Sequence, residues 1–221
     1  MTLNEQLAEL KAQNVAKHPK KIINLQLEDM KKMKESGIVD NAPKTGEKMK
    51  DFTLSGPLGI PRSLAELRKK GPVVVTFYRG GWCPYCSLEL RAYQAILKDI
   101  KDAGATLVAI TPELPDASLS TTEKNELEFE VLTDVNSEYA REIGLVFTLS
   151  ERLRPVYADF GIEIEKHNGT GQFDLPLAGT FVVDTDGTIA CAGVDADYTK
   201  RTEPSEVVAV INSLKTKKER T

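Results

Sequence analysis

The chain of 221 residues is poor in cysteine and histidine, with three of the first and two of the second. Three cysteines are too few, and odd in number, for the disulfide framework of a secreted protein. A structural zinc site needs four ligands. Beyond one closely spaced cysteine pair the sequence offers only Cys191, His18 and His167, at no ligand-like spacing. This shortage argues against zinc, and we expect both histidines to be surface residues.

The sequence also lacks an excess of positive charge and any apolar run long enough to span a membrane. A net charge of −4 gives no reason to expect nucleic-acid binding. Residues 1–6 do not begin a basic segment with an apolar core, so we expect no secretory signal. We therefore predict a cytoplasmic protein that binds neither nucleic acid nor membrane, in a compartment where a cysteine pair stays reducible.

What the sequence does contain is a cysteine pair at the junction of a strand and a helix. Residues 73–78 are β-branched and aromatic without charge, which is typical of a strand buried on both faces. Arg79-Gly80-Gly81 then provides the backbone freedom for a sharp turn. After Cys86, apolar residues recur at helical spacing as far as Ile100, with charges between them.

The position of Cys83 and Cys86 at the start of this helix has chemical consequences. The unpaired N–H groups of a first helical turn stabilise a thiolate and lower its pKa. Arg79 and Trp82 are the candidates to stabilise it further, because they lie next to the pair in sequence. Residues three apart share a helix face, so the two thiols can close a disulfide. The sequence favours a redox pair, with one attacking and one resolving thiol, over an inert structural pair.

Buried strands alternate with helices along the rest of the chain, and Asp186-Gly187 marks a final hairpin. This order predicts an α/β fold with a mixed central sheet flanked by helices. Two amphipathic helices precede it, so we predict an N-terminal helical extension over 1–40 and one domain over 41–221. These helices either pack on their own domain or form a homodimer contact. The expected helices are 2–17, 20–36, a short one from 63, 86–102, 117–127, 137–143, 151–160 (interrupted at Pro155) and one from 204; the expected strands are a small hairpin at 52–60, 73–78, 106–110, 130–133, 180–184 and 188–192, with a loop at 162–176.

Three segments together resemble the peroxiredoxin branch (alkyl hydroperoxide reductase/thiol-specific antioxidant type) of the thioredoxin-like superfamily. They are residues 77–86, 180–187 and 195–204, and the resemblance extends over about 42–214. It implies a thioredoxin-like fold and an antioxidant thiol peroxidase. Such an enzyme reduces hydrogen peroxide or organic hydroperoxides and is recycled by a thioredoxin- or glutathione-type electron donor. It needs no bound organic cofactor or metal.

The resemblance leaves the attacking thiol open. Aligned with thioredoxins, Trp82-Cys83 matches their Trp-Cys, so Cys83 attacks and Cys86 resolves. Aligned with peroxiredoxins, Cys86 matches the peroxidatic cysteine and Glu89 the acidic residue three positions after it. The arginine that peroxiredoxins usually carry before the late strand is replaced by Ala178.

Two candidate residues follow from this departure. Arg79 or Arg154 is then the candidate to replace the missing arginine. Without a replacement, a thiol–disulfide oxidoreductase acting on protein or small-molecule disulfides is the alternative, and a redox sensor is the second alternative. Cys191, flanked by alanines on a predicted strand, is either a buried inert thiol or a second resolving partner.

Overall fold

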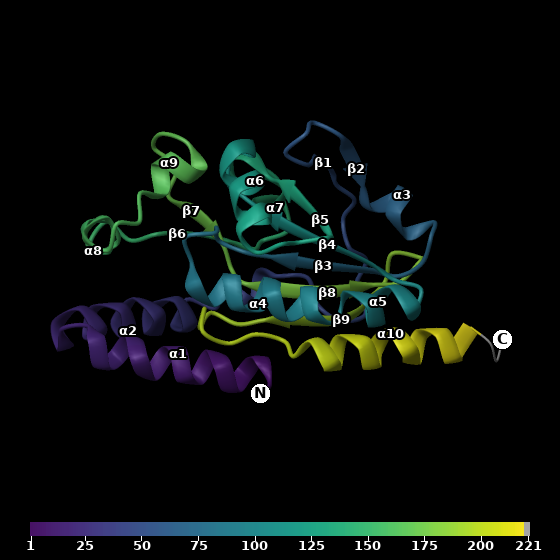
Figure 1. The fold of residues 1–221 in the computed structure, drawn as a ribbon, viewed down its shortest axis with the longest axis horizontal. Coiled ribbons are helices and arrows are strands. Elements are labelled where there is room, and N and C mark those ends of the chain that lie inside the picture. Colours follow the sequence, from purple (N-terminus) through teal and green to yellow (C-terminus); the bar gives the residue numbers. More distant parts are fainter. Residues whose placement is uncertain (219–221) are drawn as a thin grey trace.

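The structure is a computed structural model and describes residues 1–218 of the chain (Figure 1). A sheet of seven strands in the order β2-β1-β5-β4-β3-β8-β9 forms its centre. β3 runs parallel to β4 and antiparallel to β8, so the sheet is mixed, as predicted. Its strands are β1 (Thr53–Ser55), β2 (Pro61–Ser63), β3 (Val73–Phe77), β4 (Thr106–Thr111), β5 (Glu130–Thr133), β8 (Gly179–Val183) and β9 (Ile189–Val194); a second sheet pairs β6 (Val146–Thr148) with β7 (Asp174–Pro176).

Helices cover both faces of the seven-stranded sheet (Figure 1). On one face, α1, α4, α5 and α10 share a hydrophobic core with the side chains of Val74 and Val182. On the other face, α3 and α7 pack against Val73, Val75 and Phe77. The helices are α1 (Leu3–Lys17), α2 (Lys20–Glu35), α3 (Leu64–Arg68), α4 (Pro84–Ala95), α5 (Leu97–Asp102), α6 (Pro115–Lys124), α7 (Glu138–Glu142), α8 (Arg154–Asp159), α9 (Ile164–Asn168) and α10 (Pro204–Lys218), with short 3-10 helices η1 (Ile38–Asn41) and η2 (Val135–Ser137).

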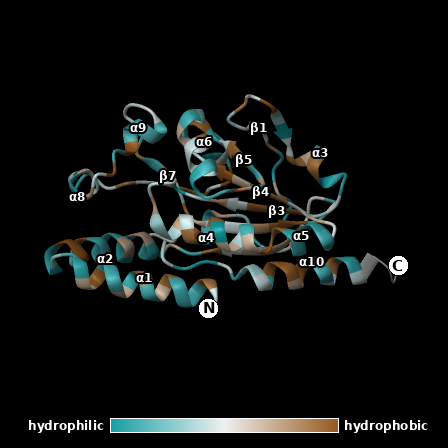
Figure 2. Cartoon of the chain, in the orientation of Figure 1, coloured by the Kyte–Doolittle hydropathy of each residue, from teal (hydrophilic) through white to brown (hydrophobic). Residues whose placement is uncertain are grey.

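The central strand β3 is fully buried, and its five residues are 0% exposed. This explains why its sequence has no polar alternation, because a strand with helices on both sides has no solvent face. Hydrophobic residues accordingly gather on the central strands in Figure 2. Among the described residues, no helix is long and apolar enough to cross a membrane.

The two N-terminal helices form a hairpin, which we call the α1–α2 hairpin (residues 3–35). Leu3 and Leu7 of α1 are buried in the same core as α4, so α1 packs on its own chain. The Glu203 carboxylate accepts hydrogen bonds from the backbone N–H groups of Leu3 and Asn4, at 3.2 and 2.6 Å. The hairpin is therefore fastened to the start of α10. The division into 1–40 and 41–221 stays a prediction.

Several sequence-based expectations were wrong in detail. The helix after the cysteines is broken at Ile96, whose backbone leaves the helical region (φ −109°, ψ 12°), so α4 and α5 replace one helix. Pro155 lies in the first turn of α8 and does not interrupt a helix. Proline is tolerated there because the backbone N–H groups of a first turn have no partner within the helix. The expected loop at 162–176 contains α9 and β7.

Candidate active site

The two thiols lie where β3 passes into α4. Cys83 is the N-cap residue of α4, Pro84 occupies its first turn, and Cys86 follows one turn on. Both cysteines are free and 0% exposed. The two cysteines are one helical turn apart, and their side chains interact. The structure therefore places the two cysteines predicted from the sequence at the N-terminal end of α4, the end of a helix that stabilises a thiolate.

The turn before the cysteines is fixed by two glycines and a buried carboxylate. Gly80 has φ +151°, and a Cβ there would lie 2.2 Å from the Trp82 indole nitrogen, so the position needs glycine. Glu113, which follows β4, accepts hydrogen bonds from the Gly81 N–H at 2.9 Å and the Tyr78 hydroxyl at 3.2 Å. The sequence analysis missed Glu113, because no pattern tied it to the cysteines.

Both histidines are partly exposed, as expected of surface residues, but each also makes a specific contact. His167 Nδ1 lies 3.1 Å from the Glu113 carboxylate, so α9 is linked through Glu113 to the turn before the thiols. The ring of His18 packs on the ring of Phe160, with centroids 4.3 Å apart. Each histidine joins two segments far apart in sequence, a contact that spacing cannot reveal. Among the described residues, no group of three or more His, Cys, Asp or Glu side chains is placed to hold a metal ion.

Arg79 lies directly against Cys83, as the sequence predicted. Its Nη2 donates to the Cys83 sulfur at 3.2 Å, and the side chain is only 3% exposed. The guanidinium also lies over the Tyr198 ring, 4.2 Å from its centroid, and 5.4 Å from the centroid of Trp82. Trp82 thus helps to orient the arginine that contacts the thiol.

Arg201 lies against the second thiol, and the sequence analysis missed it. Its Nη2 is 3.6 Å from the Cys86 sulfur, and its Nε donates to the Glu89 carboxylate at 2.6 Å. Both side chains of this ion pair are 1% exposed. Each sulfur therefore has its own arginine, one from the end of β3 and one from the segment before α10.

Arg201 lies near the position of the arginine that is absent at 178. Ala178 and Arg201 line the same cavity of about 430 Å³, together with Glu89 and Thr180. The other candidate, Arg154, donates to the Leu149 carbonyl and lies over the Phe173 ring, with no contact to either thiol. A search for an arginine near position 178 in the sequence could not find Arg201. The two positions come together only because the loop after β9 packs beside Ala178.

The environment separates the two thiols in acidity. Burial alone raises the pKa of both. For Cys83 the hydrogen bond from Cys86 and the charges of Arg79 and Arg201 outweigh burial, so its pKa lies well below the usual range of a cysteine. For Cys86 burial and the neighbouring Cys83 sulfur raise the pKa well above that range. Cys83 is accordingly the more acidic thiol of the pair.

This difference predicts how the thiolate responds to loss of its arginine. Replacing Arg79 by glutamine should raise the pKa of Cys83 towards the usual value of about 8.5, because the nearest positive charge is removed. Ultraviolet absorbance of the thiolate as a function of pH measures the pKa of Cys83. The pKa values of Cys86 and Cys191 are both raised, so Cys83 is the first thiol to ionise. Arg154→Gln is the matched control. An unchanged first step in Arg79→Gln would contradict the assignment.

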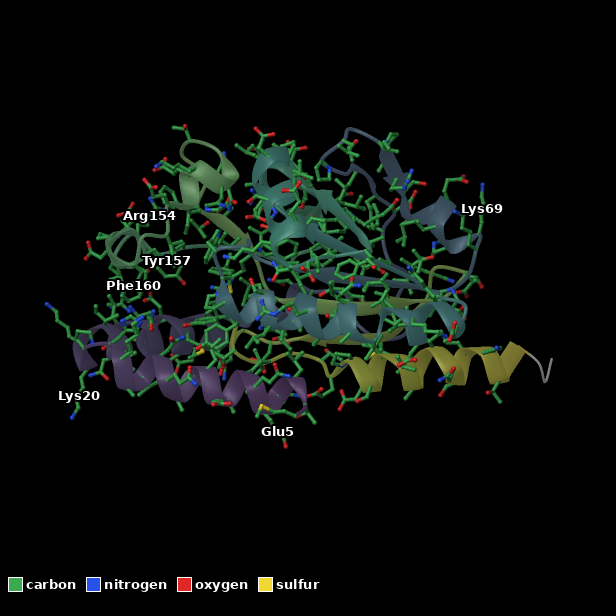
Figure 3. All side chains as sticks on the ribbon, in the orientation of Figure 1. Glu5, Lys20, Lys69, Arg154, Tyr157 and Phe160 are labelled. Carbon is green, nitrogen blue, oxygen red and sulfur yellow. The ribbon has the colours of Figure 1, made fainter. Side chains whose placement is uncertain are left out.

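A cavity of about 570 Å³ opens beside Cys83. One wall comes from the α1–α2 hairpin, including Val15 and Leu27, and another from Tyr157 and Phe160 in and after α8. Figure 3 shows Tyr157 and Phe160 on the part of the chain that overlies the hairpin. Cys83 lines this cavity and Cys86 does not. We refer to it as the hairpin pocket.

Cys191 stands apart from this site. It lies in β9, is partly buried, and packs at the edge of the core that α4 and α10 share. Burial raises its pKa, which favours an inert thiol at neutral pH. Within the described part of the chain, Cys191 forms no disulfide with Cys83 or Cys86.

Comparison with known proteins agrees with this geometry. A model of the AhpC/TSA family matches residues 45–192. A chloroplastic peroxiredoxin Q of Sedum lineare is 27% identical over 168 residues, covering 74% of this chain and 75% of the relative.

Solved structures of peroxiredoxins have the same fold. Peroxidoxin BcpB from Mycobacterium tuberculosis superposes with a TM-score of 0.60 at 22% identity, covering 77% of this chain and 97% of that one. Reduced Prx3 from Vibrio vulnificus, in complex with hydrogen peroxide, has a TM-score of 0.60 at 17% identity, covering 76% and 99%. The expected thioredoxin-like fold and the resemblance are therefore confirmed. The family model matches more than half of the sequence, and the chain belongs to the AhpC/TSA family.

Proposed function

We propose that this protein is a thiol peroxidase in which Cys83 attacks the peroxide and Cys86 resolves. The observation that carries the proposal is the Cys83 sulfur at 3.2 Å from Arg79, beside a pocket large enough for a small molecule. Membership of the AhpC/TSA family and relatives named as peroxiredoxins support the reaction. A reducing compartment such as the cytoplasm would let the pair cycle.

The reaction follows from the acidity of the two thiols. The Cys83 thiolate attacks the terminal oxygen of the hydroperoxide and the O–O bond breaks, so that Cys83 becomes a sulfenic acid. The leaving oxygen takes up one proton from solvent and departs as an alcohol, or as water when the substrate is hydrogen peroxide. Cys86 then loses its proton and attacks the Cys83 sulfur. Water leaves and a Cys83–Cys86 disulfide forms. Two electrons from a thiol donor restore the pair.

Geometry favours Cys83 over Cys86 as the attacking thiol, although the alignment with peroxiredoxins favours Cys86. Cys83 has the lowered pKa and lines the hairpin pocket, whereas the pKa of Cys86 is raised. A thiol that stays protonated is a poor nucleophile. Arg201 lies 3.6 Å from the Cys86 sulfur, where its charge can stabilise the Cys86 thiolate during the second step, and Glu89 holds Arg201 in place.

Rapid mixing of the reduced protein with one equivalent of hydrogen peroxide tests the proposal. Trp82 is the only tryptophan and adjoins Cys83, so its fluorescence should report a second-order reaction far faster than that of free cysteine. Mass spectrometry should then find the Cys83–Cys86 disulfide. Cys191→Ser should behave like the unsubstituted protein. A rate equal to that of free cysteine would sink the peroxidase assignment.

A disulfide oxidoreductase is the second candidate, and one observation favours it. Cys83 is the N-cap residue of a helix that carries Cys86 one turn later, an arrangement that serves thiol–disulfide exchange as well as peroxide chemistry. Reduction of insulin disulfides by the reduced protein separates the two candidates. Catalysis of that reaction together with an ordinary peroxide rate would favour the oxidoreductase.

A further inference from the structure

We infer that a small anionic thiol, entering the hairpin pocket, reduces the Cys83–Cys86 disulfide, and that a protein donor does not. This inference rests on the proposed function, because it concerns the disulfide that the proposed reaction leaves. It chooses between the two classes of electron donor that the sequence left open. Three features of the pocket carry it: access, charge and the position of the leaving sulfur.

Access to the cysteines is limited to molecules that fit the pocket. Both cysteines are 0% exposed, and the α1–α2 hairpin lies outside the segment matched by the family model. A pocket of about 570 Å³ is within the range of small-molecule sites, roughly 300–1,000 Å³. A protein donor would have to bring its own cysteine into contact with the Cys83 sulfur, which requires the hairpin to move.

The hairpin is held in place by contacts on both sides of the pocket. Lys11 binds Asp197 at 3.3 Å, and Asn14 donates to the Tyr85 hydroxyl at 2.9 Å. From α2, Glu28 pairs with Arg152 at 3.0 Å. Opening the pocket to a protein would break these contacts together, whereas a small thiol can occupy the pocket with the hairpin in place and needs only side-chain movement around Cys83, which is 0% exposed, to reach its sulfur.

The charges of the pocket favour an anion, most strongly in the oxidised state. Within the described residues Arg79 contacts no carboxylate, and its Nε has no hydrogen-bond partner. The Cys83 thiolate is its counter-charge. A disulfide removes that charge and leaves a buried, uncompensated guanidinium, which is costly. An arriving thiolate restores the balance at the sulfur where it must react.

The rim adds further positive charge. Lys17 lines the pocket, and the only acidic lining residue among the described ones is Asp159. Lys11 also lines it, but its charge is already paired with Asp197. Carboxylates on the reductant would find Lys17 at the rim while its thiolate meets Arg79. The pocket thus fits a thiol that carries carboxylates, such as a short acidic peptide.

The two arginines support both half-steps of the exchange. The incoming thiolate attacks the Cys83 sulfur, the disulfide breaks, and Cys86 leaves as a thiolate 3.6 Å from Arg201. The small thiol is then joined to Cys83 as a mixed disulfide in the pocket. A second thiolate attacks the small thiol's own sulfur and releases the Cys83 thiolate beside Arg79. In sum, one protein disulfide and two thiols give the dithiol and one small disulfide.

The test uses the full chain, oxidised with diamide so that no peroxide is involved. Trp82 fluorescence follows its reduction by glutathione, neutral 2-mercaptoethanol, cationic cysteamine and thioredoxin, with each small-thiol rate divided by its thiolate fraction. We expect glutathione to be fastest and cysteamine slowest, with a mixed disulfide on Cys83 by mass spectrometry. Faster reduction by thioredoxin than by glutathione at equal thiol concentration would overturn the inference, as would equal rates for all three small thiols.

Two variants place the charge and size effects in the pocket. Lys17→Glu should lower the ratio of the glutathione rate to the 2-mercaptoethanol rate about threefold to tenfold, because a rim cation becomes an anion. Lys20→Glu is the matched control, since Figure 3 shows Lys20 projecting away from the body of the molecule and it does not line the pocket. Leu27→Trp narrows the pocket at a residue that is 47% exposed, so folding is unaffected and glutathione should slow.

Failure of this inference is distinguishable from failure of the proposed function. The peroxide half-reaction is measured separately, with the protein reduced by dithiothreitol. A fast peroxide reaction with no preference for glutathione overturns the donor inference alone. A slow peroxide reaction overturns the peroxidase, and the diamide-oxidised protein still reports which donor the pocket accepts.

Discussion

Cys83→Ser should abolish the reaction with peroxide, whereas Cys86→Ser should keep one fast turnover and stop at a sulfenic acid. Loss of the attacking nucleophile lowers the rate on the order of a thousandfold or more. Cys86→Ser keeps the thiolate beside Arg79, with its sulfur at the same pocket. It lacks the second thiol, so one equivalent of peroxide is consumed and dimedone should trap the sulfenic acid on Cys83.

The same pair of variants decides between the two alignments. If Cys86→Ser abolishes the burst and Cys83→Ser retains it, Cys86 is the peroxidatic cysteine, as the alignment with peroxiredoxins implies. In whichever variant retains the burst, excess peroxide should oxidise the sulfenic acid further to a sulfinic acid, because no second thiol is present to condense with it. Cys191→Ser should cycle normally, and its failure would make Cys191 a resolving partner.

The central fold was predictable because it depends on local patterns. β3 reads as a buried strand from its residues alone, and its Gly-Gly turn leads into the cysteine helix at the expected place. The capping box of Thr2 and Glu5 similarly fixes the start of α1. The break at Ile96 and the short elements α9 and β7 were missed, because their formation depends on contacts with other segments more than on their own periodicity.

The site was predictable only in its local half. Cys83, Cys86 and Arg79 are within eight residues of one another, and sequence proximity was a sufficient guide. Arg201 and Glu113 reach the same turn from segments that lie far along the chain. Nothing in the neighbouring sequence of Arg201 or Glu113 signals these contacts, so they were seen only in the folded structure.

Arg201→Met should destabilise the protein more than any surface substitution, by about 3–5 kcal/mol, because it leaves Glu89 buried without its partner. Burial already raises the pKa of Glu89, and the charge of Arg201 opposes that rise. In the variant the carboxyl therefore takes up a proton more readily in the folded state. A carboxyl whose pKa is higher in the folded than in the unfolded state does not lower the free energy of unfolding at a pH below its unfolded-state pKa, about 4.3. It lowers that free energy increasingly as the pH rises above this value. Urea unfolding at several pH values should show the variant least destabilised under acid conditions.

Pairing this change with Glu89→Gln separates stability from chemistry. The double variant buries no unpaired charge, so most of the lost stability should return. Loss of Arg201 should also slow the second step, and that rate should not recover in the double variant, because burial raises the pKa of Cys86 and the charge of Arg201 opposes that rise. Each unit by which that pKa rises reduces the Cys86 thiolate about tenfold and should lengthen the life of the Cys83 sulfenic acid accordingly.

Arg62→Met, which breaks an exposed pair with Glu130, should change neither property much. Recovery of both stability and disulfide formation in the double variant would mean that Arg201 only neutralises Glu89, and that Cys86 ionises without its help.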